Sequence, residues 1–245
     1  MKAFWSLLTV AAITAPALAA DAPAPPPPVT INLANRQAQA TPTRQGFTHT
    51  GGGNIDVQQP SADVLVVSMT GVAVAGGHPC KDSFAALAFD LAQDFEIAAA
   101  KPETKKVKLS IEARVIGLLR TQACSGGSAG ITCPAHAAIA PCGAAGAALV
   151  EVGLPGRSVA GGENLSVNDQ HGPVTAVVPL GRYTLHEQFG VQASHPKKLL
   201  PCKAASAEFA PEPALDPLWI SAFEPFHGVQ KKDFGFRVTI KVEPE

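Results

Sequence analysis

The five cysteines of this chain are its most reactive side chains. They are Cys80, Cys124, Cys133, Cys142 and Cys202. In an oxidising compartment, cysteines in this number pair as disulfides. Cys80 and Cys202 stand in matching Pro-Cys-Lys contexts, each just before a predicted strand, so the sequence predicts a bridge between them. An odd total allows at most two bridges within one chain and leaves one thiol over.

The other three cysteines are spaced nine residues apart in a segment rich in small residues. We expect Cys124 to pair with Cys142, because these two flank the segment and would close its neck. Cys133, next to Pro134, is then the unpaired thiol, which is buried, capped or bonded to another molecule. The same spacing fits Cys124–Cys133 or Cys133–Cys142 almost as well, so these pairings stay open.

A metal site is the competing interpretation of these residues. Three thiolates and His136 are donor types that zinc accepts, but structural zinc sites use pairs about two to four residues apart, which a spacing of nine does not provide. A second pattern, His78-Pro79-Cys80, is echoed by His195-Pro196 upstream of Cys202 and would suit copper or zinc. Export favours oxidation of thiols over metal ligation. The sequence therefore predicts no metal and no cofactor.

One pattern typical of a nucleophilic enzyme is present. The G-x-S-x-G motif of a nucleophile elbow is matched by Gly126-Gly127-Ser128-Ala129-Gly130. That chemistry requires a strand before the serine and a helix after it, so that a strained turn exposes the hydroxyl. Here a cysteine-bearing glycine loop precedes Ser128 and no helical pattern follows it, which indicates a chance match. The sequence thus predicts no catalytic residue.

An enzyme is nevertheless the alternative to a non-enzymatic protein. It would be a secreted or periplasmic hydrolase with histidine or carboxylate chemistry in a cleft of the fold. This alternative gains if at least two histidines converge with a carboxylate in one pocket. The histidines concerned are His49, His78, His171, His186, His195 and His227.

The first nineteen residues have the pattern of a cleaved secretory signal peptide. Lys2 is the positive residue, an apolar stretch follows, Pro16 breaks it, and Ala17-Leu18-Ala19 offers small residues for cleavage. The apolar stretch is shorter than the roughly 20 residues that cross a bilayer. We therefore expect an exported protein, periplasmic or extracellular, with no transmembrane segment in the mature chain.

Composition excludes some classes of partner. Loss of Lys2 with the signal reduces 19 basic residues to 18, against 20 acidic residues, so the mature net charge is near −2. No block of like charge occurs, which gives no electrostatic case for nucleic acid. With 46% hydrophobic and 16% charged residues, the chain is too apolar for general disorder. Its partner is undetermined from sequence; an envelope protein and self-association through the odd cysteine are the two expectations.

After the signal, residues 20–45 begin with a proline run and continue without apolar periodicity, which predicts a disordered linker. Period-2 alternation then marks strands over residues 106–116, 182–191 and 234–243. Residues 64–74 are almost entirely apolar, which is typical of a strand buried on both faces.

Two segments are less regular. Residues 84–97 fit both a helical stripe and an alternating strand, and the strand pattern accommodates more apolar residues together with all three acids. We expect this strand to form a hairpin with 106–116 through the turn at 101–104. Residues 121–146 are rich in glycine, alanine and cysteine, and they predict a long loop stapled by disulfides.

Together these segments predict an all-β protein, an antiparallel β-sandwich or sandwich-like barrel in a single domain over 46–245, with a cysteine- and glycine-rich loop. The expected function is an exported, non-enzymatic, disulfide-stapled structural or interaction protein of the cell envelope. The hydrolase named above is the alternative.

Overall fold

Long β-strands dominate the computed structural model of this chain. The structure describes residues 28–46, 48–76, 82–121, 126–143, 148–197, 205–209 and 234–245. The strands are β1 (Val29–Gly46), β2 (Thr48–Ser61), β3 (Val64–Gly76), β4 (Ser83–Ala99), β5 (Lys106–Arg120), β6 (Ser128–Pro141), β7 (Val150–Gly153), β8 (Ser158–Ala160), β9 (Asn164–Pro179), β10 (Gly181–His195), β11 (Ala205–Phe209) and β12 (Gly235–Pro244). The described residues include no helix that could cross a membrane.

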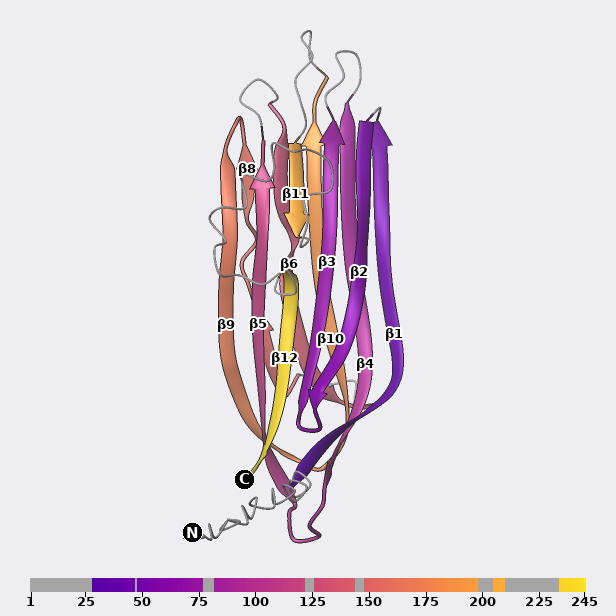
Figure 1. Cartoon of the computed structure of the whole chain (residues 1–245), viewed down its shortest axis with the longest axis vertical. Helices are drawn as coiled ribbons and strands as arrows, with labels where there is room; N and C mark the ends of the chain where they lie inside the picture. The colour runs from indigo at the N-terminus through magenta and orange to yellow at the C-terminus, as the bar shows by residue number, and fades with distance from the viewer. Residues whose placement is uncertain are drawn as a thin grey trace, which may run out of the picture.

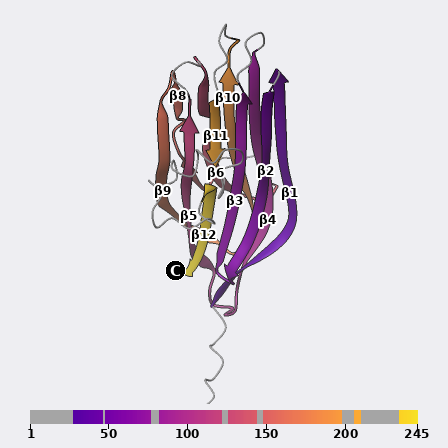
Figure 2. The same cartoon turned by 45° about the horizontal axis from the view of Figure 1, so that its top comes forward.

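The strands form two antiparallel sheets that pack face to face, which confirms the predicted β-sandwich. The first sheet has the order β1-β4-β10-β6-β7, with β8 also paired to β6. In the second sheet β2 lies beside β3, and β12 and β11 lie between β3 and β5, with β9 at the far edge. Figures 1 and 2 show the long strands running along the longest axis of the molecule.

Side-chain alternation explains why these segments are strands with one buried face. In β5, Val107, Leu109 and Ile111 are buried between the sheets, whereas Lys106 and Lys108 are exposed. Because successive side chains of a strand point to opposite faces, this pattern fixes which face of β5 packs on the other sheet. The strands predicted over 84–97, 182–191 and 234–243 are confirmed as β4, β10 and β12. The strand predicted over 64–74 is β3, which is largely buried.

The predicted hairpin between β4 and β5 is wrong. These strands follow each other in the chain, but β4 pairs with β1 and β10 in the first sheet and β5 pairs with β9, β11 and β12 in the second. The turn at 100–105 therefore connects the two sheets. Period-2 alternation reports that a strand has a buried face; it carries no information about which strand lies beside it.

Two segments predicted to be irregular are strands in the structure. Residues 29–45, which the sequence assigned to the linker, belong to β1 and pair with β4 along almost its whole length. The side chains of Val29 and Ile31, at the start of β1, are buried in the core. Residues 128–141, assigned to the stapled loop, form β6 between β10 and β7. Residues 20–27 lie outside the described part of the chain.

Strands β11 and β12 occupy a single strand position between β3 and β5. Phe209 at the end of β11 pairs with Gly71, and Phe236 near the start of β12 pairs with Met69, only two residues away on β3. The two short strands are thus successive halves of one central strand, although residues 210–234 separate them in the chain. The period-2 pattern of the sequence predicts β12. It does not predict that β11 occupies the same strand position of the sheet.

The backbone at this junction requires glycine. Gly235 has a φ of 106°, and a Cβ there would lie against the carbonyl oxygen of Met69, closer than any real Cβ contact. We expect Gly235→Ala to lower the free energy of unfolding by about 2–3 kcal/mol, since both backbone strain and a backbone clash oppose it. Urea denaturation followed by circular dichroism measures the change.

Gly161→Ala is the matched control for this prediction. Gly161 has a φ of 62° with no atom within 4 Å of the added Cβ, so it reports strain without a clash. We expect it to cost about 1 kcal/mol. Equal losses for the two variants would show that the junction between β11 and β12 is looser than the structure indicates.

Candidate functional site

Three strands of the first sheet meet at one end of the sandwich. In the antiparallel register His195, the last residue of β10, lies opposite Ser83, the first residue of β4. On the other side of β10, Ser194 lies opposite Ser128, the first residue of β6. Polar residues of three strands are therefore adjacent, although they come from distant parts of the sequence.

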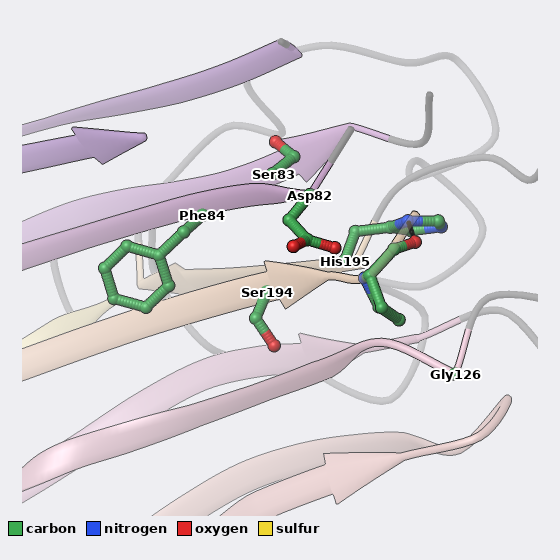
Figure 3. A pocket seen from close by; sticks show the side chains of 7 residues that line it. Asp82, Ser83, Phe84, Gly126, Ser194 and His195 are labelled. Carbon is green, nitrogen blue, oxygen red and sulfur yellow. Dashed lines mark hydrogen bonds between the residues drawn. The ribbon is translucent and has the colours of Figure 1, made fainter. Parts of the chain in front are cut away.

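A cavity of about 480 Å³ opens at this end. Figure 3 shows the side chains around it, with Asp82 and His195 on one side and Phe84 on the other. Its lining residues are Asp82, Ser83, Phe84, Gly126, Ser194, His195 and Pro196. We refer to it as the β4–β10 cavity. Its lining residues include a carboxylate, an imidazole, hydroxyls and an aromatic ring, so we take it as the candidate site among the described residues.

Backbone contacts fix the two most reactive groups of this cavity. The backbone N–H of Lys197 donates a hydrogen bond of 2.8 Å to Oδ1 of Asp82. Nδ1 of His195 lies 2.9 Å from the carbonyl oxygen of Pro196. A carbonyl can only accept, so Nδ1 carries the proton in this bond and Nε2 is an acceptor in the neutral ring. His195 is 1% exposed, and its Nε2 has no hydrogen-bond partner among the described residues.

The serines do not complete a nucleophilic triad with His195. The Oγ atoms of Ser128 and Ser194 are 2.8 Å apart and bond to each other. Ser194 and His195 are consecutive in a strand, so their side chains point to opposite faces of the sheet, and in Figure 3 the Ser194 hydroxyl points away from the imidazole. A general base must reach the proton that it abstracts. This hydroxyl pair is therefore separated from the base.

The G-x-S-x-G match does not lie at a turn between a strand and a helix. Ser128 begins strand β6, which continues to Pro141. A nucleophile elbow instead places its serine at a sharp turn between a strand and a helix. The geometry around Ser128 thus lacks the strained turn that would expose the hydroxyl.

The described histidines do not converge. His136 lies 3.7 Å from Glu151 on the outer face of the first sheet, and Nδ1 of His171 contacts the carbonyl of Gly153. His186 is exposed on the outer face of β10, and of the histidines that the structure describes only His195 lines the β4–β10 cavity. Among the residues that the structure describes, no three His, Cys, Asp or Glu side chains form a metal-binding group. The side chain of His49, and His78 and His227, lie outside them.

The cysteine pairings stay predictions. Cys142 is a free thiol in the structure, with its Sγ 3.3 Å from Oγ1 of Thr184 and 3.8 Å from Oδ1 of Asp94. The described part of the chain shows no disulfide, and the expected partner of Cys142, Cys124, lies outside it, as do Cys80 and Cys202. Cys133 lies on β6, in the middle of a strand rather than in a loop.

The connections that contain Cys80 and Cys202 begin and end at neighbouring described residues, and the bridge between the two cysteines stays a prediction. The connection that contains Cys80 joins β3 to β4, and the one that contains Cys202 joins β10 to β11. At one end of both, Ala75 pairs with Ala205; at the other, Lys197 bonds to Asp82. Both cysteines are thus within a few residues of the same two anchor points.

A buried acid in β10 is the residue that sequence analysis missed. Glu187 is 0% exposed, and neither of its carboxylate oxygens has a hydrogen-bond partner among the described residues. Burial raises the pKa of this carboxyl well above its usual range. The sequence contained an indication of this burial. Glu187 occupies the same face of the strand as the alternating apolar residues Tyr183, Leu185, Phe189 and Val191, and this face is buried.

Comparison of the chain with models of known protein families and with curated proteins gives no match.

Proposed function

We propose that this chain is an exported, non-enzymatic interaction module of the cell envelope, which presents the β4–β10 cavity at one end of a long sandwich. The arrangement of its ends supports this proposal. Val29 at the start of β1 pairs with Ala99 at the end of β4, whereas the cavity lies at Ser83, where β4 begins. The 17 residues of β4 therefore separate the entry of the chain from the cavity.

This separation is large for a single domain. At about 3.3 Å per residue a strand of this length spans on the order of 55 Å, and typical strands have about five or six residues. The C-terminus lies at the same end as the start of β1 (Figure 1). A long sandwich with the start of β1 and the C-terminus at one end and a polar cavity at the other is suited to holding a binding surface away from that first end.

The hydrolase is the second candidate, and one observation favours it. Asp82 and His195 line the same open cavity, which also contains hydroxyl groups. The opposite orientation of Ser194 and the burial of Ser83 beside His195 weigh against an accessible nucleophile. We therefore rank this function below the interaction module.

Site-specific photo-crosslinking in the native envelope tests the proposal. A photoreactive residue is introduced at Lys197 beside the cavity, at Thr175 on edge strand β9, or at Lys101 in the turn at the opposite end, each of which is exposed. We expect a discrete protein adduct from position 197 and much weaker adducts from the other two. Strongest capture from position 101, or equal capture from all three, would overturn the proposal. Hydrolytic activity that is lost in His195→Gln would favour the second candidate.

A further inference from the structure

Strand β9 forms an open edge of the second sheet. It pairs with β5 on one side, no described strand pairs with its other side, and it lies at the left edge of the molecule in Figures 1 and 2. Residues 174–178 of this strand, Val-Thr-Ala-Val-Val, carry no charge. Val177 is 52% exposed, more than any other large hydrophobic residue that the structure describes. This segment therefore lacks the charges that usually keep a sheet edge from pairing.

The backbone groups that this edge presents follow from its hydrogen bonds with β5. The N–H of Leu180 donates to the carbonyl oxygen of Lys105 at 3.3 Å, so these two residues are a hydrogen-bonded pair. Hydrogen-bonded and non-hydrogen-bonded pairs alternate along an antiparallel ladder. In the register of β9 with β5, residues 174, 176 and 178 therefore bond to β5. Thr175 and Val177 direct their N–H and C=O groups outward.

A proline bounds this segment on each side. Pro173 and Pro179 have no backbone N–H, and the carbonyl oxygen of Pro179 already accepts a bond from the Tyr183 hydroxyl. Before Pro173 the register with β5 shifts, and Gly172 has a φ of 107°. The edge that is available for pairing is thus residues 174–178, with two outward N–H donors and an acceptor on each of the same two residues.

We propose that two copies of this chain pair along residues 174–178 of β9, antiparallel and about a two-fold axis at Ala176. Thr175 of each copy then lies opposite Val177 of the other, and each of these two pairs exchanges two backbone hydrogen bonds. The outward N–H and C=O groups of both residues are all satisfied. The prolines lie opposite each other, where pairing ends. An interface of this isologous type closes at a dimer.

The side chains of this segment suit a second copy of the same segment. Ala176 falls at the axis in a non-hydrogen-bonded pair, where side chains approach most closely, and its methyl group is small. On the same face, Val174 lies opposite Val178. On the outer face Thr175 lies opposite Val177, so both kinds of pair join the β-branched residues that are favoured in sheets. No like charges are opposed within the paired segment, which identifies a second copy as the occupant.

Sedimentation equilibrium of the full mature chain tests for the dimer. The contact is a single five-residue ladder, smaller than a standard protein interface, so we expect a dissociation constant of about 0.1–1 mM. A non-reducing denaturing gel of the same samples identifies any dimer that is held by a disulfide instead.

Amide hydrogen exchange measured by NMR locates the contact. At about 1 mM protein, such a dissociation constant places roughly half to four-fifths of the chains in the dimer. The N–H groups of Thr175 and Val177 should therefore exchange about two- to fivefold more slowly than at about 10 µM. The N–H of Ser166, in the first half of β9, should exchange at the same rate at both concentrations.

Thr175→Pro removes an outward N–H donor from each copy. Proline is tolerated on an edge strand where the N–H faces solvent, so the monomer should keep its fold by circular dichroism. We expect the dimer to weaken at least about tenfold. Ser166→Pro is the matched control. Because Thr121 bonds to Glu163, the same alternation directs the N–H of Ser166 outward, but outside the proposed contact, and we expect a change of less than about threefold.

Val177→Lys is a second variant, which leaves every backbone donor in place. The side chain is half-exposed in the monomer, and a lysine on an edge strand opposes pairing with another copy. We expect the dimer to weaken at least about tenfold, whereas the neutral, β-branched Val177→Thr should stay within about threefold of the natural chain.

Four results would each overturn the inference. They are a chain that stays monomeric up to about 1 mM, a dimer that is entirely covalent, a dimer that keeps its affinity in Thr175→Pro or Val177→Lys, and association that continues beyond two copies. Slower exchange at Thr175 and Val177 together with the losses in both variants would establish the edge contact.

The dimer and the proposed function can fail independently. Gly181, two residues after β9 ends, pairs with Ile97 near the end of β4, so the paired segment is directed away from the β4–β10 cavity. At micromolar concentrations a dimer this weak is sparsely populated. Position 175 then gives at most a faint crosslinked adduct, with the mass of two copies, which is distinct from an adduct of position 197 with another protein.

Discussion

The free energy of unfolding of this protein is expected to fall as the pH rises from about 5 to 8, and Glu187→Leu is expected to abolish the fall. The native carboxyl of Glu187 is fully buried, and burial raises its pKa well above the ordinary value of 4.5. Above that value the unfolded chain releases a proton that the native protein retains. The unfolded state then binds fewer protons, so stability decreases by up to about 1.4 kcal/mol per pH unit until the native pKa is reached.

The surroundings of Glu187 make this effect large. Leu91 of β4 and Ala137 of β6 flank it in the first sheet. The inward positions of β3, β5 and β12 that the structure describes in the facing sheet are apolar. No described charge thus offsets the cost of ionisation. Even protonated, an unsatisfied buried carboxyl costs about 1–3 kcal/mol, so we expect Glu187→Leu to stabilise the protein by about 2–4 kcal/mol at pH 8.

Urea unfolding at several pH values measures both effects. Glu187→Gln should lose the pH dependence but keep most of the cost of a buried polar group. Glu96→Gln, on the exposed face of β4, is the control and should leave the pH dependence of the natural chain in place. Stability that rises with pH over this range, or a destabilised Glu187→Leu, would show that the carboxyl is ionised and paired in the native protein.

Phe189→Ala is expected to give the largest loss of stability, about 3–5 kcal/mol. Phe189 is 0% exposed and stands at the centre of the core. Its ring lies 5.8 Å from that of Phe89 in the same sheet, and 5.2 and 5.6 Å from those of Phe209 and Phe236 in the other. Truncation would leave a cavity where the two sheets contact each other, and aromatic pairs contribute beyond their buried area.

Denaturant unfolding also tests this second prediction. Leu149→Ala is the control, because Leu149 is 41% exposed and its truncation should change stability by less than about 0.5 kcal/mol. The aromatic cluster joins β11 and β12 to β10. A loss for Phe189→Ala as small as that of the control would mean that the two sheets are held together elsewhere.

The predictability of β4 and β6 from sequence differed for a physical reason. In β4 large apolar residues alternate with Asp90, Asp94 and Glu96, so the difference between the two faces is visible in the sequence. In β6 half of the described buried positions are alanine, and alanine also occurs on the outer face. A strand whose two faces carry similar small residues has no visible period. It forms because β10 and β7 supply hydrogen-bond partners on both sides.

The first strand shows the same dependence on its neighbours. Residues 29–45 are mostly polar and follow a proline run, which resembles a linker. Among residues 29–34, the part of this segment whose side chains the structure describes, Val29 and Ile31 are the apolar residues placed in the core. The backbone of β4 nevertheless pairs with this segment over nearly its full length. Backbone pairing requires no particular side chain, so composition alone underestimates a strand of this kind.

By itself, the sequence determined that this protein is an all-β chain, because period-2 alternation is a local property that each strand carries within itself. Strand pairing was decided only by the tertiary structure, since β4 and β5 present suitable buried faces and yet lie in different sheets. The same holds for the candidate site. Asp82 and Lys197 are 115 positions apart in the chain, and they meet only because the register of β4 with β10 places Ser83 opposite His195. Register is a property of two strands together, so no single segment of the sequence contains it.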